Sequence, residues 1–592
     1  MTLVQRPPLE VTGRVRSVPP VLLAVVVAAV LHLLWWQFLA TSGGDIAAQD
    51  AWAEFARSHP DSAYNLAWYG GMHPVSYSVV SPYIMAQVGV RATMILAGTI
   101  SAGLLAWLIV SRTDHKRRWI PAVYGAVALA GNALSGRVTF ALGTVFALAA
   151  LCVVFAWPRT TGSTAERWLR GLLAVVTSAL ATAASPVAGA FLGLVAATLW
   201  LRRRRPAAYA LGVPPVLVVA GSALLFPFSG RQPMAWYSTI LPVAMGVAVV
   251  ILTPRTWRTV QAGGALYILA VVAAWLVPSP VGTNVSRLGL LFGGVVLVAA
   301  VSIGAWRTSM VARRFGVRAA TVLLAAALIT STIWQIAYAF RDVVSSAPPE
   351  SFSSDIDPLL YQLRARQADL ARVEVVPTKS HREAAAIAPH VALARGWNRQ
   401  ADAERNPVFY RDSDLTAKAY RRWLHRWAVG YVVLSTTATP DPAAAEEAEL
   451  VAGGLPYLEQ VWADDEWTLY VVKNPTPLVS PPAEVVAYDA AELTVTTPRA
   501  GRIVVRIADS PWLSLVDANG EPLPSVTDTD AADSLEGGSE PACLSGLDAE
   551  FPGDTTDGPR DDWLVLHAPA AGTYRIAAPY KLPRGTSCPT QE

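Results

Sequence analysis

The sequence predicts an α-helical polytopic membrane domain of about eleven transmembrane helices, followed by an extracytoplasmic α/β module and a β-sandwich. Hydrophobic residues make up 53% of the 592 residues, charged residues only 15%, and the mean hydropathy is +0.36. A soluble globular chain carries roughly 25% charged residues. Long apolar runs occupy residues 20–341, and short strand-like patterns occupy much of the rest. The chain therefore divides into a membrane part and a polar part.

The apolar runs set the first domain boundaries. A run of about 17–25 apolar residues can cross a bilayer as a helix. The first run is too long for the core of a signal peptide, so we expect it to remain as a helix. Residues 1–19 then form a cytoplasmic N-terminus, and 20–341 form the transmembrane domain, with a long first outer loop over 42–90. The eleven runs cover 20–41, 91–111, 120–136, 138–157, 171–186, 187–201, 208–227, 236–253, 260–278, 288–306 and 319–339.

The distribution of charge orients these helices. With the N-terminus inside, the inner loops collect about 20 Lys and Arg residues and the outer loops about five, which is the positive-inside pattern. A turn at Ser185–Pro186 keeps the block 202–205 inside, whereas one long helix over 171–201 is the alternative. An odd number of spans places the chain after residue 340 outside the cytoplasm. Because the Arg clusters alternate with apolar runs, no nucleic-acid partner is expected.

The sequence of the exported part predicts two domains. Residues 342–478 read as an α/β module, because buried strands alternate with helical segments. Residues 479–592 read as a β-sandwich, because short alternating strands follow one another. Cys543 and Cys588 both fall in this sandwich, where an extracytoplasmic location permits a disulfide. The expected strands are 371–376, 430–435, 467–472, 492–497, 502–507 and 563–567, and the expected helices are 357–371 and 415–426.

The first outer loop is the longest of the membrane part, and long loops in compact domains are usually functional. Its residues 45–58 have helical spacing, with Trp52 and Phe55 on one side and Asp50 on the other. Such a helix is expected to lie in the membrane interface with Trp52 and Phe55 inserted. Asp45 stands at its start, where the first span leaves the membrane. A turn rich in aromatic and polar groups follows and contains His73.

A long first outer loop with an acidic residue at its start, an interfacial helix, about eleven spans and an exported C-terminal part resemble the GT-C glycosyltransferases over residues 20–340. The segments 135–143 (SGRVTFALG) and 282–289 (GTNVSRLG) are also similar to actinobacterial membrane proteins of the arabinosyltransferase-like or mannosyltransferase-like kind, often labelled major-facilitator transporters. The resemblance implies an enzyme that takes a sugar from a polyprenyl-phosphate carrier and passes it to an envelope glycan or glycoprotein. This loop departs from the family because it has no adjacent Asp–Glu pair.

The acidic residues of the loop are the candidates for catalysis. Glycosyl transfer needs a carboxylate that takes a proton from the acceptor hydroxyl, or that holds a metal ion. Asp45 is the first candidate base and Asp50 the weaker one, whereas Asp45 as a simple helix cap is the alternative. The cofactor is unknown, and a divalent metal ion is possible. No Cys/His cluster indicates zinc, and no glycine-rich motif indicates a nucleotide site.

Basic and aromatic residues on the outer side supply candidate binding groups. Arg137 and Arg287 are rare cations at the outer ends of spans, so they are candidates for holding the donor phosphate. His73 is a third candidate. The alternatives are that the arginines reach ordinary lipid headgroups and that His73 only supports a turn. Trp397 and Arg399 are candidates for binding a sugar acceptor, and the alternative for Trp397 is a loop anchor in the domain core.

Two other functions compete with the enzyme. A secondary transporter usually carries ionisable residues within its spans. Here the span interiors are nearly free of them, with His32 as the exception. A non-catalytic membrane protein of envelope assembly is the second alternative, because Asp45 stands without an acidic neighbour.

Overall fold

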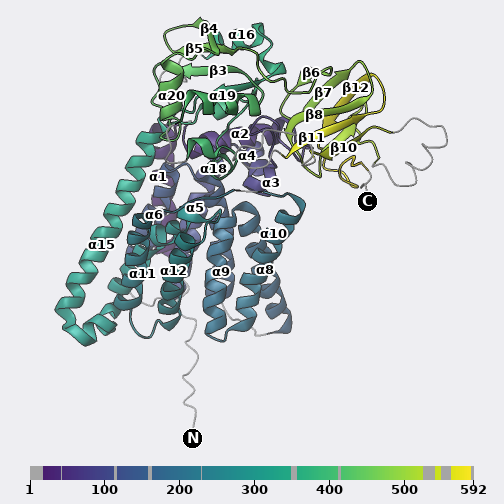
Figure 1. Ribbon diagram of the computed structural model, residues 1–592. Helices are drawn as coiled ribbons and strands as arrows, with labels where there is room; N and C mark the ends of the chain where they lie inside the picture. The colour runs from purple at the N-terminus through teal and green to yellow at the C-terminus, as the bar shows by residue number, and fades with distance from the viewer. Residues whose placement is uncertain are drawn as a thin grey trace. The chain divides into compact units, whose positions relative to one another are not determined.

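The computed structural model describes residues 18–41, 43–112, 117–157, 163–228, 230–347, 356–410, 415–524, 541–547 and 562–588 (Figure 1). The chain separates into two compact units. The helical unit contains the described residues of 1–40, 91–220 and 233–341, and the second unit contains those of 41–90, 221–232 and 342–592. The predicted N-terminal segment lies almost entirely outside the described residues.

The helical unit consists of apolar helices joined by short turns, as the runs predict. Helix α1 packs on α6, α7 packs on α8, and α11 packs on α12. The elements are α1 (Val18–Phe38), α5 (Val90–Arg112), α6 (Trp119–Leu134), α7 (Val138–Leu151), η2 (Cys152–Ala156), α8 (Thr164–Ala184), α9 (Pro186–Leu201), α10 (Arg205–Leu225), η3 (Trp236–Thr239), α11 (Ile240–Leu252), α12 (Arg258–Leu276), η4 (Gly282–Val285), α13 (Ser286–Leu288), η5 (Gly289–Gly293), α14 (Gly294–Ser302), η6 (Ala305–Thr308) and α15 (Met310–Ser346).

Every predicted apolar run lies on a helix of this unit. Among the described residues, seven helices are long and apolar enough to cross a membrane, and three shorter apolar helices accompany them. The remaining run, 171–186, falls in α8, whose first turns carry Glu166, Arg167 and Arg170. The helical membrane architecture is therefore confirmed, whereas the count of eleven spans stays a prediction.

A break at Ser185 separates α8 from α9. Ser185 has extended backbone angles (φ −156°, ψ 114°), and Pro186 begins α9. Proline at the first position of a helix lacks only an N–H that would be unpaired there. Of the two readings of 171–201, the structure has the one with a turn.

The α/β part of the second unit contains a five-stranded sheet with the order β2-β1-β3-β5-β4. Strand β1 is parallel to β2 and β3, and β5 is antiparallel to β3 and β4. Helices α19 and α20 pack against β3 (Figure 1). The predicted α/β pattern is confirmed. Its elements are α16 (Asp357–Ala365), η8 (Ala368–Leu370), β1 (Arg372–Val375), α17 (Glu383–Ala386), β2 (Ala392–Leu393), α18 (Arg399–Arg405), η9 (Pro407–Phe409), α19 (Ala417–Arg426), β3 (Val429–Ser435), α20 (Ala445–Ala452), β4 (Leu458–Ala463) and β5 (Trp467–Val472).

Two smaller sheets form the predicted sandwich, with the orders β10-β11-β8 and β6-β7-β12-β9. Their inner faces share one apolar core that includes Leu493, Val505, Leu566 and Ile576. A disulfide joins Cys543 to Cys588. The strands are β6 (Glu484–Tyr488), β7 (Glu492–Thr497), β8 (Gly501–Ala508), β9 (Ser514–Val516), β10 (Cys543–Gly546), β11 (Trp563–Ala568) and β12 (Gly572–Ala577).

The first outer loop contains α2 (Asp45–Ser58), α3 (Pro74–Tyr77) and α4 (Ser81–Val88), and it packs with the C-terminal sheets. Trp52 is 0% exposed and Phe55 5% exposed, and both lie in one core with residues of α16 and β1. The expectation that these two side chains insert into the membrane interface is therefore wrong. The apolar face of α2 is covered by protein, so no apolar face remains for lipid.

Backbone hydrogen bonds also join this loop to the five-stranded sheet and to the sandwich. Leu393 of β2 donates its N–H to Ala67, and Ala508 of β8 donates to Gly70, each at 2.8 Å. The predicted domain bounds, which assign 42–90 to the transmembrane domain as its first outer loop, stay a prediction. The loop belongs to the second unit, together with residues 221–232.

Candidate functional site

A pocket in the helical unit brings Arg137 and Arg287 together. Arg137 lies in the turn before α7, and Arg287 lies on α13, so residues 150 positions apart share one site. The lining comes from α6, the α6–α7 turn, α13–η5 and α15: Ala128, Gly131, Asn132, Ser135, Arg137, Arg287, Leu290, Leu291, Gln335, Tyr338 and Ala339.

Local backbone conformation positions the two arginines. Gly136 has φ 67°, a left-handed conformation that glycine adopts at low cost, and it turns the chain just before Arg137. The Asn132 amide donates a hydrogen bond to the Arg137 carbonyl at 3.2 Å. Arg287 lies two residues before η5, a π-helical turn, and such turns are frequent at functional sites.

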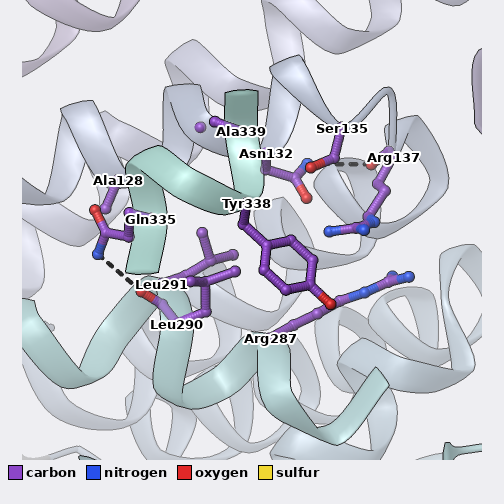
Figure 2. Close-up of a pocket in the computed structure, with 11 residues that line it drawn as sticks. Ala128, Asn132, Ser135, Arg137, Arg287, Leu290, Leu291, Gln335, Tyr338 and Ala339 are labelled. Carbon is purple, nitrogen blue, oxygen red and sulfur yellow. Dashed lines mark hydrogen bonds between the residues drawn. The ribbon is translucent and has the colours of Figure 1, made fainter. Parts of the chain in front are cut away.

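Tyr338 lies between the cations and the apolar end of the pocket. The Cζ atom of Arg137 lies 5.8 Å from the centre of the Tyr338 ring, and that of Arg341 lies 4.1 Å from it. Arg287 lies 5.2 Å from the Phe140 ring. Figure 2 shows the side chains of Arg137 and Arg287 on the same side of the Tyr338 ring. The pocket thus combines positive charge with an apolar wall, which suits an anion attached to an apolar chain.

Asp45 is the first residue of α2 in the second unit. The N-cap position belongs to Gly44, with φ 63°, so Asp45 is not the capping residue itself. A carboxylate in the first helical turn is favoured by the partial positive charge of the helix N-terminus. Asp50 lies one turn further along, 3.9 Å from the Arg382 guanidinium. The two acidic candidates therefore stand in different surroundings.

Trp397 contacts the residue before α2, and the Arg399 guanidinium lies over the Trp397 ring. The Trp397 indole N–H donates to the carbonyl of Gly44 at 2.9 Å. The His381 ring stacks on the indole, with 3.4 Å between ring centres and 11° between the planes. Arg399 donates two hydrogen bonds to Asp441, at 3.0 and 2.7 Å. We call His381, Trp397, Arg399 and Asp441 the Trp397 cluster.

The basic side chains of the Trp397 cluster, His381 and Arg399, lie against carboxylates. Nε2 of His381 lies 3.2 Å from Asp441, and Nδ1 lies 3.5 Å from Glu383. Burial alone would lower the pKa of His381, but the two carboxylates raise it above its usual value. Burial opposes ionisation of Asp441, yet hydrogen bonds from His381 and Arg399 hold its pKa below the usual range. Sequence reasoning missed His381 and Asp441, since they lie 60 residues apart and share no motif.

The His73 ring is buried and contacts protein groups through both nitrogens. Its Nδ1 lies 2.8 Å from the Ala63 carbonyl, and its Nε2 lies 3.1 Å from the Ser510 hydroxyl. Burial lowers the pKa of His73 to about 4, so the ring is neutral near pH 7. Both ring nitrogens of His73 therefore contact protein oxygens, and its role as a phosphate partner stays a prediction.

The possible metal ion remains a prediction from chemistry. Within the part of the chain that the structure describes, no three His, Cys, Asp or Glu side chains are grouped so as to hold a metal. Asp45 and Asp50 are the acidic candidates at the start of α2, and neither has two further ligands of these types beside it among those residues.

Comparison with known proteins gives one family match and several structural neighbours. Residues 480–592 match a family model described as "Domain of unknown function (DUF8823)". A comparison with curated proteins gives no match. Among solved structures, the chain is similar to the arabinofuranosyltransferase AftD from Mycobacteria, with 13% identity and a TM-score of 0.45, over 96% of this chain and 58% of that one.

Two further neighbours have similar scores. The oligosaccharyltransferase of Archaeoglobus fulgidus, tethered with an acceptor peptide, has 11% identity and a TM-score of 0.45, over 71% of this chain and 69% of that one. ArnT from Cupriavidus metallidurans, bound to undecaprenyl phosphate, has 15% identity and a TM-score of 0.36, over 78% of this chain and 98% of that one. These neighbours are glycosyltransferases of the GT-C class that the sequence resembles.

Proposed function

We propose that this protein is a membrane glycosyltransferase that moves a sugar from a polyprenyl-phosphate donor to a cell-envelope acceptor outside the cytoplasm. One observation carries the proposal: Arg137 and Arg287, distant in sequence, line one pocket among the membrane helices. Cations within a membrane domain are costly and usually mark a functional site. The excess of Lys and Arg in the predicted inner loops supports an outer location for this pocket.

The chemistry of the lining supports a lipid-linked phosphate as the ligand. A guanidinium matches the geometry of a phosphate and can donate two hydrogen bonds to it. Leu290 and Leu291 supply apolar surface beside the arginines, which suits the first isoprene units of a carrier. Two positive charges also offset the charge that collects on the phosphate as it leaves the sugar.

Asp45 is the candidate base in this reaction. The acceptor hydroxyl attacks the anomeric carbon of the sugar and gives its proton to the Asp45 carboxylate. The bond from the anomeric carbon to the phosphate oxygen breaks, and the electron pair stays on the polyprenyl phosphate. A positioned carboxylate typically contributes about 10²–10⁴-fold to such a transfer. Asp50 is the weaker candidate, because Arg382 lies beside it.

Native mass spectrometry of the detergent-purified protein tests the donor site. We expect a bound polyprenyl phosphate, and we expect Arg137→Ala and Arg287→Ala each to weaken its binding about tenfold or more, since a hydrogen bond to a charged group is worth ~1.5–3 kcal/mol. Arg205→Ala is the matched control, because Arg205 is an exposed arginine of the same helical unit.

The same experiment separates the proposed enzyme from its rivals. A carrier that binds equally well to all four proteins would mean that the pocket is not the donor site. No bound carrier in any sample, even after polyprenyl phosphate is added, would contradict the proposal and favour a transporter or a non-catalytic envelope protein. Proton-coupled flux in vesicles would then distinguish those two.

A further inference from the structure

We propose that Trp397 is a positioning residue that fixes the backbone before Asp45, and that His381 holds the Trp397 ring in place. The proposal rests on the proposed role of Asp45 as the base. It revises the expectation that Trp397 binds the sugar acceptor.

The first step is the fixation of Gly44. Its carbonyl accepts a hydrogen bond from the Trp397 indole at 2.9 Å, and its N–H donates to the Ser380 carbonyl at 2.6 Å. Both polar backbone groups of the residue before Asp45 are therefore bound by the segment 380–397. Gly44 has φ 63° and ψ −142°, angles that a residue with a side chain rarely adopts. The start of α2 is thus set by contacts outside the helix.

The second step is the fixation of the indole. His381 covers one face of the Trp397 ring, and the Arg399 guanidinium lies 5.1 Å from the ring centre. Asp441 contacts both of these groups, at 3.2 Å from His381 and 2.7 Å from Arg399. His381 itself has φ 52°, a conformation that costs energy for a residue other than glycine. One carboxylate therefore holds both groups that contact the indole.

A third set of contacts anchors the chain on either side of Trp397. Arg395 donates to Asp402 at 3.1 and 2.8 Å and to Glu447 at 2.9 Å, and all three side chains are buried. Arg399 is fixed by Asp441, as described. Because the residues two positions before and after Trp397 are both ion-paired, the indole has little freedom to move.

These contacts favour positioning over acceptor binding. A Trp that stacks on a sugar needs a free ring face and often a free N–H. In Trp397 the N–H is bonded to Gly44, and His381 lies against one face. The residue that this arrangement positions is Asp45, which directly follows Gly44.

The test replaces the indole donor and leaves an aromatic ring. Trp397→Phe removes the hydrogen bond to Gly44 and keeps a ring for His381. Trp512→Phe is the matched control, because the Trp512 indole also donates to a backbone carbonyl, that of Leu225 at 2.7 Å, and also stacks on a ring, that of Phe226. Trp512 lies in the same compact unit.

Amide hydrogen exchange is the first readout. We expect the amides of 44–50 to exchange about fivefold faster in Trp397→Phe, the factor that corresponds to one lost hydrogen bond. We expect no change there in Trp512→Phe. Equal exchange in the wild type and Trp397→Phe would overturn the proposal, and it would do so whether or not the protein is a glycosyltransferase.

Transfer kinetics with labelled polyprenyl-phosphate sugars are the second readout. We expect Trp397→Phe to lower kcat and to leave KM for the donor unchanged, because the indole holds the base and not the donor. Faster exchange with an unchanged kcat would also overturn the proposal. If the wild type transfers no sugar, the proposed function fails, and exchange alone then decides whether Trp397 fixes the start of α2.

Discussion

His381 is a buried residue whose charge depends on its neighbours. Asp441 and Glu383 face it, Arg399 faces it through Asp441, and Trp397 covers its ring. The two carboxylates raise its pKa against the effect of burial. A group with a raised pKa in the folded state stabilises the fold below its unfolded pKa, about 6.5, and this contribution is lost as the pH rises through the folded pKa.

His381→Asn should therefore cost more stability at low pH than at high pH. We expect the difference in apparent melting temperature between the wild type and this variant to be larger at about pH 6 than at about pH 8.5. Burial and Arg364 lower the pKa of His390. The control His390→Asn should therefore show no larger difference at the lower pH. Differences for His381→Asn that are equal at the two pH values would contradict a protonated His381.

Candidate site residues were predictable from the sequence where a residue type is rare at its predicted position in the membrane domain. Arg137 and Arg287 drew attention as cations on the predicted outer side, and they do line one pocket. Their convergence was not predictable, because it depends on how helices 150 residues apart pack. The contacts of His73 were not predictable either, since no sequence pattern shows that Ala63 and Ser510 lie beside its ring nitrogens.

The segment 64–73 of the first outer loop is held by side chains from other parts of the second unit. Arg405 donates to the carbonyls of Tyr69 and Gly71, both at 2.7 Å. Gly71 has φ 123°, and a Cβ there would overlap the Tyr64 ring. Because Tyr64 is 2% exposed in the sandwich core, it cannot move aside easily.

Gly71→Ala should destabilise the second unit by ~2 kcal/mol or more, since backbone strain and overpacking add. Gly454→Ala is the control, because Gly454 also has a positive φ, 81°, but nothing lies within 4 Å of its Cβ position. We expect the control to lose only about 1 kcal/mol. Chemical denaturation followed by tryptophan fluorescence measures both. An equal loss in the two variants would show that the Tyr64 contact is unimportant.

Elements with strong periodicity were predictable, and their partners were not. The predicted strand 492–497 matches β7 (Glu492–Thr497), and the predicted strand 467–472 matches β5 (Trp467–Val472). The helix α2 was also predicted at its observed bounds, but its apolar face packs on protein and not on lipid. An amphipathic pattern specifies that one face is buried, and it does not specify what buries it.

At the scale of the whole molecule, three stretches of chain build the second unit. The first outer loop bonds to the α/β sheet through Ala67 and to the sandwich through Gly70. The carboxylate candidate Asp45 thus enters a framework made largely by residues 342–592. The α/β module and the β-sandwich were predictable from the sequence. The association of the loop with them was not, because a long-range contact leaves no local signal in the sequence.

Sugar transfer by the purified protein from labelled polyprenyl-phosphate sugars, with Asp45→Asn and Asp50→Asn beside the wild type, is the most direct measurement. We expect the wild type to consume a donor, Asp45→Asn to be slower by about 10²–10⁴-fold with its binding of polyprenyl phosphate intact, and Asp50→Asn to stay near the wild type. An Asp45→Asn protein that transfers at the wild-type rate, or a wild type that leaves every donor unconsumed, would contradict a glycosyltransferase with Asp45 as its base.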